Sequence, residues 1–268
     1  MAVGTTNSGK STSSLSILDK LIKQRKKTLI IDPTGEYIEA FSDVNSLTLG
    51  EDTVISTGEL SSQQWEILFE TNDNTQGSIL SEAMKSLRFQ KQTQTSSVYK
   101  KIGKSPAEVD ADMTTVIERG FDLSLLPSQI NQESVEISNR APNVGKYVYN
   151  TFGANVNAWL VQKVQHKLSN SSFTTFFGDD PSKSNLISKL NEFSHSETSS
   201  LYIDCSKIGT TDGIGGMIVD LISNHLINLD KIDIKPFVMF IDEVHRYTKS
   251  VTNELDYHTG LTSIAREG

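Results

Sequence analysis

A short run near the start of the chain has the residue types and spacing of a phosphate-binding loop. Gly4 and Gly9 let backbone N–H groups approach a phosphate chain where a side chain would block them. Lys10 reaches the β- and γ-phosphates, the Ser11 hydroxyl ligates Mg²⁺, and Thr12 adds a second hydroxyl. An amphipathic helix follows at once, which disfavours an accidental match and predicts a site for ATP and Mg²⁺. The whole run matches the Walker A pattern G-x-x-x-x-G-K-[ST], and it reads Gly4-Thr5-Thr6-Asn7-Ser8-Gly9-Lys10-Ser11-Thr12.

A second candidate group of charged residues follows an apolar run late in the chain. Residues 237–241 are all apolar and are followed directly by Asp242 and Glu243, in the form of a Walker B element with an adjacent carboxylate. Asp242 would hold Mg²⁺ through its water shell, and Glu243 would orient or deprotonate the attacking water. The alternative is that the two acids cap a following helix. A buried strand in front of them, in a chain with a P-loop, favours the catalytic interpretation, with His245 as the one histidine near the site.

The elements that would position these groups are buried strands separated by helices. Residues 28–32 form a short apolar run that ends at Asp32, and Pro33 and Gly35 force a turn after it. Ligands of open α/β sheets bind outside the carboxyl ends of the strands, so we expect residues 32–37 near the nucleotide. The pattern therefore predicts an α/β fold with a mainly parallel sheet flanked by helices. The later elements are predicted as strands at 200–205 and 237–241, the latter covered on both faces, and helices at 213–229 and 253–267.

The middle of the chain combines a polar composition with helical patterns. Residues 90–198 are rich in Ser, Asn, Gln and Thr, yet their apolar residues recur at helical spacing. We therefore predict a polar, mostly helical insertion or subdomain within one ATPase domain of residues 1–268. Before it, residues 59–69 and 79–87 favour helices, with Ser61 or Ser62 as a cap and Trp65 as a core anchor. Helices within it are expected around 107–118, 158–168 and 186–193.

Composition narrows the class of protein. The chain has 268 residues, 36% hydrophobic and 22% charged, with a formal net charge of −8. A net negative charge argues against a surface that is basic all round, although a ring can confine its positive charge to a pore. The basic cluster at residues 23–27, including Lys27, reads as the solvated end of a helix rather than a DNA patch. No apolar run approaches the ~20 residues of a membrane span, and the single cysteine suits a reducing compartment, so we expect a cytoplasmic protein.

The motifs together resemble the HerA family of hexameric DNA-translocating ATPases, in the HerA/FtsK group. The most discriminating part is D-P-x-G-E-Y after the P-loop helix. The resemblance implies a RecA-like P-loop NTPase core, and an arginine, Arg266, near the nucleotide or the subunit boundary. It leaves residues 90–198 unmatched, and the family's N-terminal β-barrel and C-terminal sensor strand have no counterpart in this sequence. The runs that carry the resemblance are the P-loop, Ile31-Asp32-Pro33-Thr34-Gly35-Glu36-Tyr37, Phe240-Ile241-Asp242-Glu243-Val244-His245 and Ile264-Ala265-Arg266-Glu267-Gly268.

Three functions are compatible with these residues. The leading hypothesis is an ATP-driven hexameric ring that moves along duplex DNA in its pore, with a nuclease or another effector, in DNA-end processing or anti-phage defence. The alternative is a nucleotide-dependent ring scaffold that assembles and activates a partner effector without translocation. A small-molecule kinase is disfavoured because it gives no role to the D-P-T-G-E-Y run. Asp32 and Glu36 are further candidates for hydrogen bonds to water or to a neighbouring subunit, and Arg246 and Arg140 stand behind Arg266 as candidate arginine fingers.

Overall fold

The computed structural model of the chain describes residues 10–41, 44–71, 75–169, 171–208, 214–229 and 234–243, without the side chains of residues 10, 11, 171 and 172. The predicted glycines of the P-loop, the helix at 253–267, His245, Arg246 and Arg266 lie outside these residues. The chain forms two compact units. We call residues 1–54 and 180–268 the sheet unit, and residues 55–179 the helical unit.

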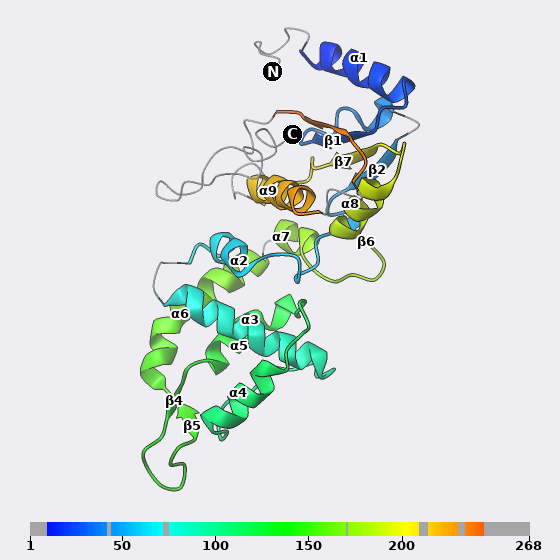
Figure 1. The fold of residues 1–268 in the computed structure, drawn as a ribbon. Helices are drawn as coiled ribbons and strands as arrows, with labels where there is room; N and C mark the ends of the chain where they lie inside the picture. The colour runs from blue at the N-terminus through cyan, green and yellow to red at the C-terminus, as the bar shows by residue number, and fades with distance from the viewer. Residues whose placement is uncertain are drawn as a thin grey trace. The chain divides into compact units, whose positions relative to one another are not determined.

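The sheet unit is built on a four-stranded parallel sheet with the order β2-β7-β1-β8. Figure 1 shows α1 on one side of this sheet and α8 and α9 on the other. A second, two-stranded parallel sheet joins β3 to β6. The elements are α1 (Lys10–Lys23), β1 (Thr28–Asp32), a 3-10 turn (Ile38–Ala40), β2 (Asn45–Thr48), β3 (Thr53–Val54), β6 (Ser184–Asn185), α8 (Leu186–His195), β7 (Leu201–Asp204), α9 (Ile214–Ile227) and β8 (Val238–Ile241).

The register of the sheet explains its core. Ile30 of β1 pairs with Tyr202 of β7 and Phe240 of β8, and paired residues project to the same face. On this face Ile30 and Tyr202 form a buried cluster with Leu18 of α1, against which Phe240 packs. Leu29 and Ile31 project to the opposite face and are also fully buried. The predicted parallel α/β fold and the strands at 28–32, 200–205 and 237–241 are therefore confirmed.

Two expectations for the sheet unit are corrected. Lys27 is buried rather than solvated, because its ammonium donates to the carbonyl of Ser194 at 2.7 Å and lies 4.5 Å from the ring centroid of Phe193. Burial lowers the pKa of Lys27. The strand β8 is less covered than predicted, because it stands at the edge of the described sheet and Val238 is 43% exposed. An apolar run indicates a strand but does not tell a central strand from an edge strand.

The helical unit has an aromatic core and an antiparallel hairpin. Trp65 is fully buried and stacks on Phe69 at 5.6 Å between ring centroids, with Phe121 and Phe177 tilted against it. Ser61 caps α2 in a reciprocal pair of hydrogen bonds with Gln64, as predicted for the cap. The elements are α2 (Ser62–Leu68), α3 (Gln76–Gln92), α4 (Pro106–Thr114), a 3-10 turn (Leu123–Leu125), α5 (Leu126–Gln132), β4 (Val135–Ile137), β5 (Tyr147–Tyr149), α6 (Thr151–Ser169) and α7 (Ser171–Phe176).

The boundaries of the helical unit differ from the predicted middle region at both ends. The unit begins at residue 55 and ends at residue 179, whereas the polar composition predicted 90–198. Residues 184–195 belong to the sheet unit because β6 pairs with β3 and α8 contacts α9. The helices α2 and α3 belong to the helical unit because they contact each other and α3 also contacts α4, α5 and α6. The polar segment of the sequence therefore does not coincide with the helical unit.

Candidate nucleotide site

Three carboxylates meet at one edge of the sheet because three neighbouring parallel strands end there. Asp32 ends β1 and pairs in register with Asp204, which ends β7. Asp242 follows β8 directly, and its backbone N–H donates to the carbonyl of Ile31 at 3.0 Å. This edge is the carboxyl end of the sheet, where open α/β folds bind their ligands.

Asp32 is fully buried, and its carboxylate is occupied by groups of its own unit. Its Oδ1 accepts hydrogen bonds from the Thr34 N–H at 2.8 Å and the Thr34 hydroxyl at 2.6 Å. Its Oδ2 accepts from the Tyr37 N–H at 3.1 Å and the Tyr202 hydroxyl at 2.8 Å. The expectation that Asp32 hydrogen-bonds water or a neighbouring subunit is therefore wrong, because a buried carboxylate with four donors shapes the turn instead.

Tyr37 joins the buried carboxylate to Asp242. While its N–H donates to Asp32, its hydroxyl donates to Oδ2 of Asp242 at 2.7 Å. Tyr37 is only 1% exposed, so the hydrogen bond to Asp242 is held by a fixed side chain. Burial raises the pKa of the Tyr202 hydroxyl, and its hydrogen bond to Asp32 raises it further. The Tyr202 hydroxyl therefore stays protonated and donates to Asp32, and the Tyr37 hydroxyl donates to Asp242.

Gly35 allows the turn after β1 to approach β7. Its φ of +72° lies in the left-handed region, which disfavours residues with a side chain. A Cβ atom at this position would lie 3.1 Å from the Cβ of Ser206 and 3.2 Å from Oδ1 of Asp204. That Asp204 oxygen accepts the N–H of Ser206 at 2.8 Å. Both the backbone conformation and the close approach therefore require glycine within the D-P-T-G-E-Y run.

The environment of Asp242 fits a role toward Mg²⁺. Its Oδ1 has no hydrogen-bond partner among the described residues, while Oδ2 accepts from Tyr37. No group of three or more His, Cys, Asp or Glu side chains within the described residues could hold a metal by itself. Mg²⁺ commonly takes one or two carboxylates and fills its other positions with water and phosphate oxygens. One available oxygen at the strand end suits that mode of binding.

Glu243 and Lys10 are described only in part. Glu243 is half-exposed and has a φ of 44°, in the left-handed region that residues with a side chain seldom adopt. Such strained positions concentrate at functional sites. Lys10 and Ser11 lie on α1, as the P-loop pattern requires, and their side chains lie outside the described residues. The site roles of Lys10, Ser11, Asp242, Glu243 and Arg266 stay predictions.

Sequence reasoning missed Tyr202 as part of this site. Its side chain contacts Asp32 only because β7 pairs with β1 in this register, with Ile30 opposite Tyr202. The two residues are 170 positions apart in the chain. The sequence shows Tyr202 two positions before Asp204, the aspartate that ends the strand. A single sequence does not indicate which strands become neighbours, so it could not predict that Tyr202 contacts Asp32.

A parallel sheet flanked by helices, with acidic residues at the carboxyl ends of its strands, defines the sheet unit as an α/β P-loop NTPase core. The family described as "Helicase HerA, central domain" matches residues 2–228. The chain belongs to this family, and the resemblance inferred from the motifs is confirmed. The domain is therefore a nucleotide-dependent ATPase domain of the HerA/FtsK type.

No curated protein matches the chain. Within the residues that the structure describes, no helix combines the length and the apolar character needed to cross a membrane.

Proposed function

We propose that the chain is the ATPase core of a hexameric ring that hydrolyses ATP to move along duplex DNA. The proposal is carried by a HerA-family match to a chain in which Tyr37 holds Asp242 at the end of β8, directly before Glu243. Residues Gly4–Thr12 would bind the triphosphate, and Ser11 and Asp242 would hold Mg²⁺. We further propose that the ring works in the cytoplasm with a nuclease or another effector, in DNA-end processing or anti-phage defence.

The reaction assigns one task to each charged residue. Water attacks the γ-phosphorus, the bond to the β–γ bridging oxygen breaks, and ADP and inorganic phosphate leave. Glu243 orients the water and accepts its proton as the new P–O bond forms. Lys10 stabilises the negative charge on the β- and γ-phosphate oxygens, and bound Mg²⁺ would supply further positive charge there. Arg266 of a neighbouring subunit would add a cation in the transition state.

A second candidate function uses the same site without translocation. In a nucleotide-dependent scaffold, ATP binding would order the ring, and the ring would activate a partner effector. The pair Asp242 and Glu243 favours a working hydrolase, because a scaffold that only binds nucleotide needs no group to activate water. The two functions share the P-loop and differ in whether turnover is coupled to movement on DNA.

Mixed rings test the proposed catalytic site in the full-length protein. Glu243→Gln should bind ATP and hydrolyse it at least ~10²-fold more slowly, because it keeps the shape of the side chain and removes the base. Arg266→Ala should lower turnover strongly and ATP affinity less, because the arginine contact matters most in the transition state. When the two variants are mixed, some boundaries combine an intact Glu243 with an intact Arg266, and activity should partly return.

The controls separate the roles of the two residues. Lys10→Ala should lose most of its ATP affinity by calorimetry, and mixing it with Glu243→Gln should restore no activity, because no subunit of such a ring holds both Lys10 and Glu243. Absence of recovery between Glu243→Gln and Arg266→Ala, in rings that do exchange subunits, would exclude Arg266 as a residue acting across the boundary. Near-normal turnover by Glu243→Gln alone would place the base elsewhere.

A further inference from the structure

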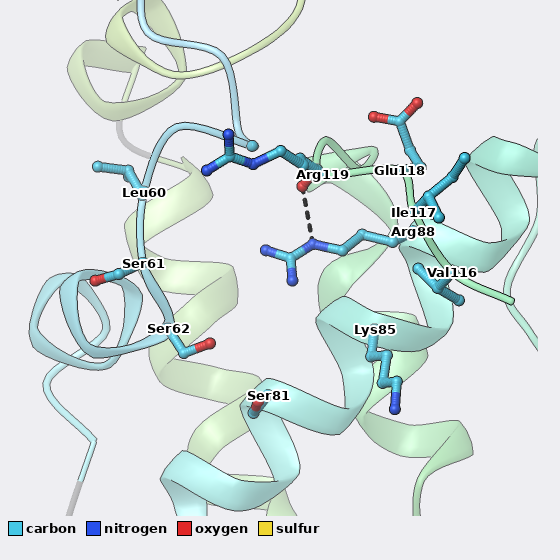
Figure 2. Close-up of a pocket in the computed structure, with 11 residues that line it drawn as sticks. Leu60, Ser61, Ser62, Ser81, Lys85, Arg88, Val116, Ile117, Glu118 and Arg119 are labelled. Atoms are coloured by element: carbon cyan, nitrogen blue, oxygen red, sulfur yellow. Dashed lines mark hydrogen bonds between the residues drawn. The ribbon is translucent and has the colours of Figure 1, made fainter. Parts of the chain in front are cut away.

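A polar cavity of about 430 Å³ in the helical unit is lined by three cationic side chains. Lys85 and Arg88 come from α3, and Arg119 comes from the loop after α4. Ser62 and Ser81 add hydroxyl groups to the lining, and Glu118 is its one carboxylate (Figure 2). An excess of positive charge is notable here because the chain as a whole carries a net charge of −8.

The two arginines present their charged ends to the same side of the cavity. Nε of Arg88 donates to the backbone carbonyl of Arg119 at 2.8 Å, which fixes the direction of the Arg88 side chain. Figure 2 shows both guanidinium groups pointing toward the segment of Leu60 and Ser62, with the Glu118 carboxylate pointing away. Among the described residues, the terminal nitrogens of both arginines have no hydrogen-bond or ion-pair partner. A guanidinium offers these donors as a planar fork that matches two oxygens of one anion.

The loop that carries Arg119 is held in place by other side chains. The Thr57 hydroxyl donates to the carbonyl of Phe121 at 2.9 Å and accepts its N–H at 2.8 Å. The Gln92 side chain of α3 accepts the N–H of Ile117 at 2.8 Å and donates to Thr115 at 2.9 Å. Gly58 lets the chain pass close to this loop, because a Cβ there would lie 2.7 Å from the carbonyl carbon of Arg119. The backbone position of Arg119 is therefore set by the fold before any ligand arrives.

The electrostatics of the cavity favour an anion. Arg88 is half-buried, and burial, followed by repulsion from Arg119, lowers its pKa. Glu118 opposes this shift but does not form an ion pair with either arginine in the described structure. Its Oε1 instead accepts the N–H of Gly120 at 2.8 Å. Bringing like charges together at a partly desolvated site costs free energy that a bound anion would offset.

We propose that this cavity, at Arg88 and Arg119, is a binding site for a phosphate group. Two guanidinium forks, the Lys85 ammonium and the Ser62 and Ser81 hydroxyls are the donors that a tetrahedral phosphate accepts from. Free phosphate and the phosphodiester of a nucleic acid share this chemistry. Only the nucleic-acid source rests on the proposed function, because it places duplex DNA against the helical unit.

Titration with inorganic phosphate tests the site in the intact chain. The Lys10→Ala variant is used as the background, so that the nucleotide site does not contribute to the binding. In NMR spectra, the Nε–Hε resonances of Arg88 and Arg119 should shift together with added phosphate, and those of Arg25 and Arg140 should not. Arg119→Gln should weaken phosphate binding roughly tenfold or more, the size expected for losing a charge-assisted bidentate contact.

A matched control distinguishes binding of phosphate in the cavity from nonspecific electrostatic attraction of phosphate to the protein surface. Lys100 is exposed and does not line the cavity, so Lys100→Gln removes the same charge and should change phosphate affinity less than about twofold. If Arg119→Gln does not fold, Arg88→Lys replaces it in the test. This variant keeps the charge and removes the planar fork of donors, so it should also weaken phosphate binding. Unshifted Arg88 and Arg119 resonances, or equal losses in Arg119→Gln and Lys100→Gln, would overturn the proposal.

The two sources of phosphate are then distinguished with duplex DNA in the full-length protein. If a phosphodiester occupies the cavity, Arg119→Gln should lower the slope of log affinity against log salt concentration by about 1, and Lys100→Gln should leave it unchanged. If the phosphate is free, both variants should bind duplex DNA as the unsubstituted protein does. Whichever source supplies the phosphate, Arg119→Gln should leave DNA-independent ATP hydrolysis unchanged. A result against the phosphate site can therefore be told apart from a result against the proposed ATPase function.

Discussion

At the residue scale, Asp32 and Asp242 occupy the same edge of the sheet in opposite environments. Asp32 is buried beneath four hydrogen-bond donors, whereas Asp242 is half-buried and uses one oxygen for Tyr37. A carboxylate that is fully hydrogen-bonded stabilises structure, and one with an oxygen to spare can reach a ligand. The D-P-T-G-E-Y run therefore serves mainly to build the turn and hold Tyr37 against Asp242.

The Tyr37→Phe variant tests this role of the run. The change removes the hydroxyl that donates to Asp242 at 2.7 Å and leaves the ring in its cluster. We expect a loss of about 1–3 kcal/mol in the free energy of unfolding, the size of a hydrogen bond to a charged group. The concentration of Mg²⁺ needed for half-maximal ATP hydrolysis should also change, because Asp242 loses its fixed orientation.

Tyr149→Phe is the matched control, because Tyr149 is 55% exposed. It should alter neither the free energy of unfolding, measured by chemical denaturation, nor the Mg²⁺ dependence. If Tyr37→Phe matched this control in both measurements, the hydrogen bond to Asp242 would have no part in holding the site.

The sequence predicted the residues at this edge better than their contacts. A strand that ends at Asp32 predicted that residues 32–37 lie near the nucleotide, and this stays a prediction. The structure adds that Tyr37 of this run contacts Asp242, a predicted site residue. The burial of Asp32 and its contact with Tyr202 could not be predicted, since they depend on β7 lying next to β1. Local chemistry is visible in a sequence, whereas strand order is set by packing across distant segments.

At the element scale, the helices α8 and α9 contact each other in the sheet unit. His225 on α9 places Nε2 at 2.8 Å from Oδ1 of Asn191 on α8. Burial lowers the pKa of His225 from its ordinary value of 6.5. Burial therefore favours the neutral imidazole in the folded state.

The burial of His225 predicts how stability depends on pH. Because the pKa of His225 is lower in the folded state, the unfolded chain binds more protons just below pH 6.5. The free energy of unfolding should be at its full value above that pH, and it should fall as the pH drops toward the folded-state pKa. Chemical denaturation monitored by circular dichroism at several pH values measures this slope.

Two substitutions make the pH prediction specific. His225→Gln, which keeps a side-chain donor and cannot titrate, should flatten the dependence below pH 6.5. His166→Gln changes an exposed histidine on α6 and should leave the pH dependence of stability unchanged. An unchanged slope in His225→Gln would show that other groups produce the acid sensitivity.

The elements themselves were largely predictable because their signals are local. The apolar runs at 28–32 and 237–241 predicted β1 and β8, and the cap at Ser61 predicted α2. Lys27 was misplaced because its burial depends on Phe193 and the Ser194 carbonyl, far along the chain. A cation with a long apolar stem can be buried when such partners exist, and its own neighbours in sequence do not reveal them.

At the scale of the whole molecule, the chain combines a sheet unit with a helical unit inserted between β3 and β6 in the sequence. The HerA family match at residues 2–228 includes the whole helical unit. The nucleotide site lies in the sheet unit, and the proposed phosphate site lies in the helical unit. Composition indicated that an inserted region exists but placed its boundaries incorrectly. Boundaries follow from which segments contact one another, as β6 contacts β3, and not from polarity.

The central claim is that ATP hydrolysis drives movement along duplex DNA, and displacement of a third strand measures that movement directly. The full-length protein is placed on duplex DNA that carries a triplex-forming strand at a distance, and release of that strand is followed with ATP and Mg²⁺. We predict release by the unsubstituted protein, and none above background by Glu243→Gln, which still binds ATP, or by Lys10→Ala. ATP hydrolysis by the unsubstituted protein without any strand release, or equal release by Glu243→Gln, would contradict the claim.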